Sequence, residues 1–216
     1  MAIRGIQPGV GIALLTMECQ NGPTNPEYSG PDGLAGQCEQ RKIIDRIADL
    51  ADVCREAGFP VFHNKLVHRP DWAGSGVNSP LLGSNKKRHK MVRGTPEVEM
   101  HPRLRAHPDD FYVERLTGVT PFYASALDQL LRNCDTRTVI LTGVSTNLGI
   151  PGAAIEAVNR GYNVVIPEDC TAGVWPEAHE FQVKHTLPIL AAMTTSDELV
   201  DAIRLMHSGT GERTGA

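Results

Sequence analysis

Runs of apolar residues alternate along the chain with segments in which apolar residues recur every three or four positions. The runs predict buried strands, and the recurring positions predict helices with one apolar side. The strands are expected at residues 10–17, 60–67, 110–115, 136–141, 162–166 and 191–194. The helices are expected at residues 37–57, 121–132, 150–160, 177–187 and 196–205.

This alternation predicts an α/β fold with a mainly parallel six-stranded sheet covered by helices on both faces. Right-handed crossovers favour the doubly wound form. The 216 residues fit one globular domain, and no linker divides them. The polar, glycine-rich tail at 208–216 is expected to be disordered.

Two segments have no periodic pattern. Residues 21–37 are rich in Gly, Pro and Asn and predict a long surface loop. Residues 68–110 contain scattered Pro, Gly and His and a basic cluster at 86–90. A loop of that length is usually functional. We therefore expect 68–110 to form either a binding lid or a contact between subunits, and the sequence does not choose between them.

Composition excludes several classes of protein. Hydrophobic residues make up 41% and charged residues 21% of the chain, which is typical of a soluble protein. A net charge of −4 argues against nucleic acid or an anionic membrane as a partner. No apolar run approaches the roughly 20 residues of a membrane span, and residues 1–11 lack a signal-peptide pattern. We therefore expect a cytoplasmic protein.

The five cysteines include no C-x-x-C pair and are odd in number. They therefore indicate neither a disulfide framework nor a zinc site, and we expect mostly inert, semi-buried thiols. His63, His68 and Asp71 are weak candidates for metal ligands, but so loose a group is more often loop polarity. No G-x-G-x-x-G follows the first strand, so no dinucleotide is indicated, and we expect no metal and no cofactor.

The candidate chemistry lies where the carboxyl ends of parallel strands converge. Glu18 follows the first strand, Arg115 ends the third, and a glycine-rich turn at 142–152 follows the fourth. Partial desolvation would raise the pKa of Glu18 and suit it to general acid or base catalysis. Arg115 either binds a substrate carboxylate or neutralises Glu18. The alternative for the pair is a salt bridge with no chemical role. The turn offers backbone N–H groups for an oxyanion or a carboxylate.

Five segments, in order, resemble the isochorismatase-like superfamily, which includes cysteine amidohydrolases such as nicotinamidases. Residues 13–21 (ALLTMECQN) are similar to the family's A-L-L-x-I-D-M-Q-N, and residues 93–99 resemble its G-T-x-G-x-E segment. Residues 121–131 are similar to S-x-F-x-x-T-x-L-D-x-x-L. Residues 143–149 stand where the family has G-V-x-T-x-x-C, and residues 154–169 resemble the segment that follows.

The resemblance implies a Rossmann-like three-layer αβα sandwich, an Asp-Lys-Cys triad and a cis peptide bond, here between Val144 and Ser145. Glu18, Arg115 and Gly149 stand at the three triad positions. Without a thiolate at 149, no thioester can form there. The matching segments assign substrate binding to five residues: Gln20, Val144, Ser145, Thr146 and Asn147.

True isochorismatases, which hydrolyse a vinyl ether, resemble this chain in having glycine at the cysteine position. We therefore expect a hydrolase of a small, carboxylated molecule that uses Glu18 for non-covalent acid/base chemistry. The alternative is an inactive member with a ligand-binding or assembly role. An open pocket touching the three triad positions favours an enzyme, and a filled pocket favours the alternative. Members of the family are commonly homo-oligomers, so the resemblance also implies self-association.

Overall fold

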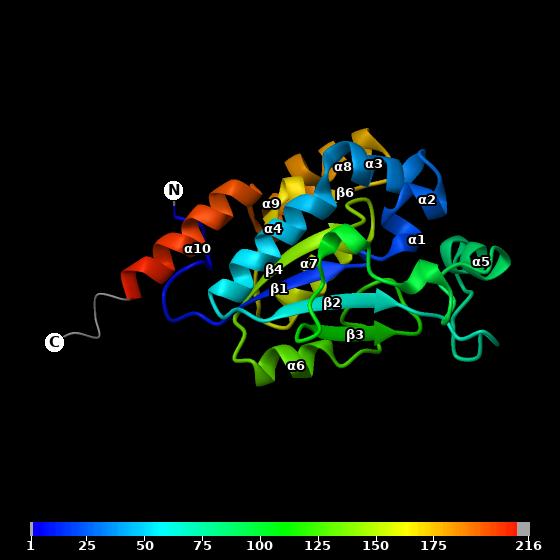
Figure 1. Ribbon diagram of the computed structural model, residues 1–216, viewed down its shortest axis with the longest axis horizontal. Helices are drawn as coiled ribbons and strands as arrows, with labels where there is room; N and C mark the ends of the chain where they lie inside the picture. The colour runs from blue at the N-terminus through cyan, green and yellow to red at the C-terminus, as the bar shows by residue number, and fades with distance from the viewer. Residues whose placement is uncertain (1, 211–216) are drawn as a thin grey trace.

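A parallel sheet forms the centre of the computed structural model, which describes residues 2–210 (Figure 1). The strands are β1 (Ile12–Met17), β2 (Val61–Leu66), β3 (Phe111–Arg115), β4 (Thr138–Val144), β5 (Asn163–Pro167), β6 (Thr171–Ala172) and β7 (Ala192–Thr194). The six predicted strands lie in the order β3-β2-β1-β4-β5-β7, and every pair is parallel. The sequence did not predict β6, whose two residues pair with β4, because two residues are too few for an alternating pattern.

Helices cover both faces of the sheet. The α-helices are α1 (Asn21–Thr24), α2 (Pro26–Ser29), α3 (Gly33–Arg41), α4 (Ile43–Glu56), α5 (Pro80–Lys87), α6 (Leu127–Asn133), α7 (Gly149–Asn159), α8 (Pro176–Phe181), α9 (Leu187–Leu190) and α10 (Ser196–Thr210). Short 3₁₀ turns are η1 (Pro96–Val98), η2 (Pro102–Leu104) and η3 (Glu168–Cys170), and η4 (Gln182–Thr186) is a π-helix. No helix among residues 2–210 is both long and apolar enough to span a membrane.

Alternate side chains of β1, β2, β4, β5 and β7 belong to two separate cores. In β1, Ile12 and Leu14 pack with α4 and α10 on one face. Ala13 and Leu15 pack with α6, α7 and α9 on the other face. This alternation is the period-two geometry of a strand, and both sets are fully buried because both faces are covered. The predicted three-layer αβα sandwich is confirmed.

Two predictions before the second strand were wrong. The single helix expected at 37–57 is broken at Lys42, whose left-handed backbone (φ +55°) separates α3 from α4. The apolar stripe of the prediction belongs to α4 alone. The surface loop expected at 21–37 instead contains α1, α2 and the start of α3. Its polar residues serve local structure: Asn25 accepts a hydrogen bond from the backbone of Glu27 and caps α2.

The helix expected at 121–132 begins only at Leu127. Residues 121–126 form turns in which Ala124 is left-handed (φ +51°) and the Ser125 hydroxyl bonds the backbone at both sides. The helix expected at 177–187 runs from Pro176 to Leu190 with the π-helix in its middle. Pro188 lacks the N–H that regular α-helical pairing needs, which accounts for the wider turn before it.

The unassigned segment 68–110 contains α5, capped by the Ser79 hydroxyl, and the turns η1 and η2. In Figure 1, α5 lies beyond the carboxyl ends of β1, β2 and β3. At the end of the chain, residues 208–210 continue α10, so that part of the predicted disordered tail is helical. Residues 211–216 of the predicted tail lie outside the described residues.

Candidate functional site

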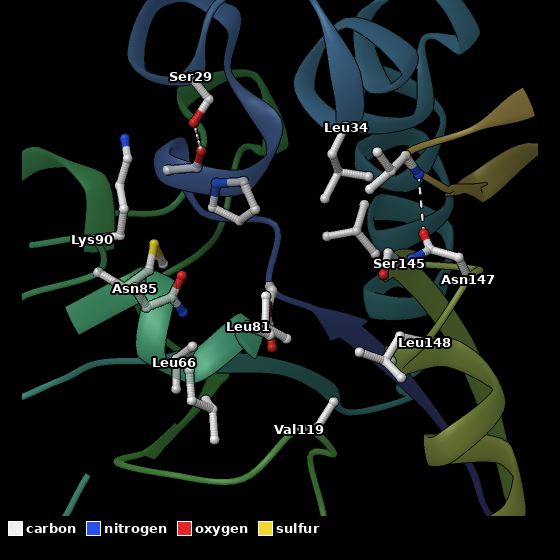
Figure 2. A pocket seen from close by; sticks show the side chains of 18 of the residues that line it. Ser29, Leu34, Leu66, Leu81, Asn85, Lys90, Val119, Ser145, Asn147 and Leu148 are labelled. Carbon is white, nitrogen blue, oxygen red and sulfur yellow. Dashed lines mark hydrogen bonds between the residues drawn. The ribbon is translucent and has the colours of Figure 1, made fainter. Parts of the chain in front are cut away.

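A cavity of about 270 Å³ opens at the carboxyl ends of β1, β3 and β4 (Figure 2). It lies beside the point where the strand order reverses between β1 and β4, which is the usual ligand position in an open α/β sheet. Glu18, Arg115 and Gly149 all line it. The three positions identified from the sequence therefore meet at one open cavity.

Glu18 follows β1 directly and has a left-handed backbone (φ +49°). Its N–H donates to the carbonyl of Asn64 in β2 at 2.9 Å, which fixes the turn at the end of β1. The side chain is 21% exposed, so its carboxylate is the accessible charged group at this end of the cavity.

Arg115 ends β3 and lies behind Glu18. Its side chain is 1% exposed; Nη2 donates to the Glu18 carboxylate and Nη1 donates to the carbonyl of Gly118 at 3.0 Å. Burial lowers the pKa of the guanidinium to about 10, which leaves it charged at neutral pH. Of the two roles that the sequence allowed, the structure places Arg115 in the one that neutralises Glu18.

The turn after β4 forms the opposite wall. Gly143 has φ +97°, and a Cβ there would clash with the carbonyl oxygen of Met17, so only glycine fits. The peptide bond between Val144 and Ser145 is cis, as the resemblance implied. The Ser145 carbonyl accepts from the N–H groups of Leu148 and Ile150, at 3.1 and 3.0 Å, and so closes the turn onto α7.

Backbone donors of this turn remain available to a ligand. The N–H groups of Asn147 and Gly149 have no acceptor within the described part of the chain. The side chain of Asn147 is fixed, since its Oδ1 accepts from the backbone of Val174 at 3.0 Å (Figure 2). Val144, Ser145 and Asn147 also line the cavity, so the turn offers uncharged hydrogen-bonding groups to a bound molecule.

Gly149 is the first residue of α7 and supplies no nucleophile. A Cβ at this position would lie 3.2 Å from both the terminal carbon of Met17 and the carbonyl oxygen of Val144. No cysteine is among the residues that line the cavity. Cys19, although next to Glu18, is fully buried in the core on the α4 side of the sheet, and burial raises its pKa. It does not replace the missing thiol.

Gln20 and Thr146, two of the predicted substrate-binding residues, do not line the cavity and are fully buried. The Gln20 amide donates to the carbonyls of Leu66 and Val98 and accepts from the N–H of Leu66. The Thr146 hydroxyl bonds Nδ1 of His179 at 3.0 Å. Both side chains hold the walls of the cavity in place from behind.

The three weak metal candidates do not come together. His63 lies between Thr16 and Asp110, each at 2.8 Å, and His68 bonds Ser75 and the Leu116 carbonyl. Asp71 is exposed and pairs with Arg69. Within residues 2–206, no group of three or more His, Cys, Asp and Glu side chains is arranged to hold a metal ion.

The sequence allowed segment 68–110 to be a binding lid or a subunit contact, but it did not identify the individual residues that form the outer wall of the cavity. This wall comes from α3 and from the segment around α5, with Leu34, Leu81, Leu82, Asn85, Lys90 and Met91. Neither segment has a strong apolar period. The Ser79-Pro80 pair was the available signal, because serine at the N-cap followed by proline is a typical helix start.

Known proteins resemble this chain over most of its length. The isochorismatase domain model matches residues 12–198. An uncharacterised isochorismatase family protein, YecD of Escherichia coli O157:H7, is 27% identical over 169 residues, which cover 75% of this chain and 84% of the relative. Nicotinamidase 3 of Arabidopsis thaliana is 27% identical over 162 residues, 74% of this chain and 78% of the relative.

Among solved structures, a cysteine hydrolase of Pseudomonas syringae pv. phaseolicola 1448A has the same fold, with a TM-score of 0.82 and 21% identity over 95% of this chain and 98% of the other. An isochorismatase family protein of Burkholderia thailandensis has a TM-score of 0.72 and 24% identity over 94% of this chain and all of the other. Since the domain model spans most of the sequence, the protein belongs to the isochorismatase family.

Proposed function

We propose that the protein is a hydrolase of small molecules in which Glu18 transfers the proton and no covalent bond to the enzyme forms. One observation carries the proposal: Glu18, Arg115 and Gly149 line the same open cavity. A filled cavity would have favoured an inactive binding or assembly protein. Space for a ligand beside an accessible carboxylate favours a catalyst.

The absence of a cysteine thiol from the cavity wall selects the chemistry. Nicotinamidase 3 and the cysteine hydrolase are named for cysteine or amide reactions, but this chain has Gly149 at the position that the family resemblance assigns to the thiol. Vinyl-ether hydrolysis needs only a proton donor and water. Glu18 protonates the outer vinyl carbon, water adds to the resulting oxocarbenium carbon, and the hemiacetal breaks into an alcohol and an aldehyde while the carboxyl group regains a proton.

Arg115 acts through Glu18 in this scheme. Its positive charge favours the ionised carboxylate, and a guanidinium cannot donate the proton itself. Glu18 must therefore itself be protonated when the substrate binds, and the water that adds to the oxocarbenium carbon returns its proton. The free N–H groups of Asn147 and Gly149 would hold the ether oxygen as it becomes the leaving alcohol.

The test is turnover with aryl and alkyl vinyl ethers, read as release of acetaldehyde, beside a matched set of amides. We expect wild-type protein to cleave vinyl ethers, and Glu18→Gln to lose at least about a hundredfold in rate, the usual contribution of a general acid. Each of the five Cys→Ser variants should keep full activity. The proposal is contradicted if activity depends on a cysteine, or if the Glu18→Gln variant keeps the wild-type activity.

A further inference from the structure

We infer that the cavity selects an uncharged substrate with an apolar body, in place of the carboxylated molecule that the sequence led us to expect. The inference rests on the proposed function and deepens it by naming the substrate class. It follows from the state of the two cationic side chains at the cavity, Arg115 and Lys90.

Burial shields Arg115 from an anion in the cavity, because only 1% of its side chain is exposed. Two of its nitrogens are engaged, one by Glu18 and one by the Gly118 carbonyl, and the third, Nε, is buried without a partner. With 1% of its side chain exposed, Arg115 meets the cavity through Glu18. An incoming carboxylate would have to displace Glu18, and a second negative charge would then lie beside the first.

Lys90 is engaged as well. Its Nζ donates to a carboxylate oxygen of Glu97 at 2.5 Å and to the Tyr28 carbonyl at 3.2 Å. Figure 2 shows its amine directed away from Asn85 and Leu66. Among the described residues that line the cavity, each cation therefore already has its own carboxylate.

The rest of the wall suits a neutral, apolar molecule. Its larger side chains are mainly aliphatic and include Leu34, Leu66, Leu81, Val119, Leu148 and Val174. Burial of apolar ligand surface against them is favourable by about 25 cal/mol per Å². An ionised carboxylate without a partner would instead lose several kcal/mol of hydration. The balance favours the uncharged ligand.

Uncharged hydrogen-bonding groups lie on opposite sides of the cavity. Ser145 and Asn147 are on one side, and Asn85 is on the other (Figure 2). The first pair belongs to the turn that ends at Gly149, so the reacting end of the substrate belongs there. Asn85 then meets the far end, where an amide or a hydroxyl group would pair with it. The substrate class is a vinyl ether with an apolar middle and an uncharged polar end.

Two probes of nearly the same shape test this inference: 4-(vinyloxy)benzamide, which is neutral, and 4-(vinyloxy)benzoate, which is an anion at pH 8. Calorimetric titration at pH 8 gives a Kd for each. For the wild-type protein we expect the benzamide to bind at least about tenfold more tightly. Equal or tighter binding of the benzoate, or no binding of the benzamide up to its solubility, would overturn the inference.

Charge removal provides a second readout. Glu18→Gln leaves Arg115 without its counter-charge, so the ratio of the two Kd values should shift by about tenfold toward the benzoate. The matched control is Glu114→Gln, next to Arg115 but paired with Arg93 at the surface and outside the cavity, which should leave the ratio unchanged. A ratio that Glu18→Gln does not move contradicts the inference. If Glu18→Gln does not fold, the ratio of the two Kd values for the wild-type protein is the test of the inference.

These titrations separate the inference from the proposed function. Selective binding of the benzamide without release of acetaldehyde contradicts the proposed chemistry and leaves the charge selection intact. Cleavage of the benzoate in preference to the benzamide supports the chemistry and contradicts the charge selection.

Discussion

The Glu18 carboxylate accepts a hydrogen bond from Nη2 of Arg115, although β2 lies between the strands that carry them. Neighbouring strands are about 4.8 Å apart, so the pair bridges roughly twice that distance at the end of the sheet. The resemblance assigns these positions to aspartate and lysine in the family. Glutamate and arginine are both longer and meet directly, which turns two potential ligand-binding charges into one neutral pair.

This pairing predicts a strong energetic coupling. Glu18→Gln leaves a charged, 1% exposed guanidinium unpaired and should lower the free energy of unfolding by about 2 kcal/mol or more. Arg115→Met removes that charge, so the double variant should recover part of the loss. Urea unfolding of the wild type, both single variants and the double variant should give a coupling energy of about 1–3 kcal/mol. Strict additivity would contradict a direct pair.

Two glycines of the same turn are expected to differ in their tolerance of a methyl group. Gly143→Ala adds a Cβ that clashes with the Met17 backbone at a positive φ, and should cost about 3 kcal/mol or more. Gly149→Ala adds a Cβ at 3.2 Å from its neighbours, where small shifts suffice, and should cost about 1 kcal/mol. Thermal unfolding of the two variants provides the comparison. Equal losses would contradict this account of the turn.

The sequence was sufficient to predict six of the strands, all except β6, and three residues of the inner wall of the cavity. Parallel strands converge at their carboxyl ends, so residues at three strand ends, such as Glu18, Arg115 and Gly149, are brought together by topology alone. The family resemblance added the cis bond at Ser145. The sequence did not choose between the two roles of Arg115, because its pairing with Glu18 depends on how far two side chains reach across β2.

The outer wall and the direction of individual side chains depend on tertiary packing, which local sequence patterns do not determine. Leu81 comes from a segment without a strong apolar period, and its place over the cavity depends on how α5 folds back. Gln20 and Thr146 are close in sequence to cavity residues, but both point into the protein and bond groups behind the wall. Lys42 has a left-handed conformation that breaks the helix predicted at 37–57. No local sequence motif predicts that conformation.

The buried imidazole behind the turn predicts an acid-sensitive contribution to stability. Burial, and then the charge of Arg41, lower the pKa of His179 to about 4. Since the unfolded-state pKa is about 6.5, the contribution is complete above that pH and is lost as the pH falls toward 4. Between pH 7.5 and 4.5 it should amount to about 2 kcal/mol.

Urea unfolding at the two pH values measures this contribution. Between pH 7.5 and 4.5, the free energy of unfolding of His179→Gln should fall by about 2 kcal/mol less than that of the wild type. His185→Gln, a matched change at an exposed histidine of the neighbouring π-helix, should behave as the wild type does. If His179→Gln loses as much stability on acidification as the wild type does, the acid sensitivity comes from other groups.

The cysteines predict how the protein responds to thiol reagents. Cys19, Cys38, Cys54 and Cys170 are buried, and burial raises the pKa of each thiol, to about 12 for Cys38 and Cys54. Only the half-buried Cys134 is open to modification. Because reactivity follows the thiolate and its exposure, the native protein should release about one equivalent of chromophore from Ellman's reagent, and the unfolded protein five.

The same reagent tests whether catalysis needs a thiol. Cys134 does not line the cavity, so protein labelled at Cys134 should turn over vinyl ethers at the wild-type rate. Cys134→Ser is the control and should release almost no chromophore until it is unfolded. Rapid labelling of a second thiol together with loss of turnover would place a reactive cysteine at the site. That result would replace the carboxylate of Glu18 with a thiolate as the catalytic group.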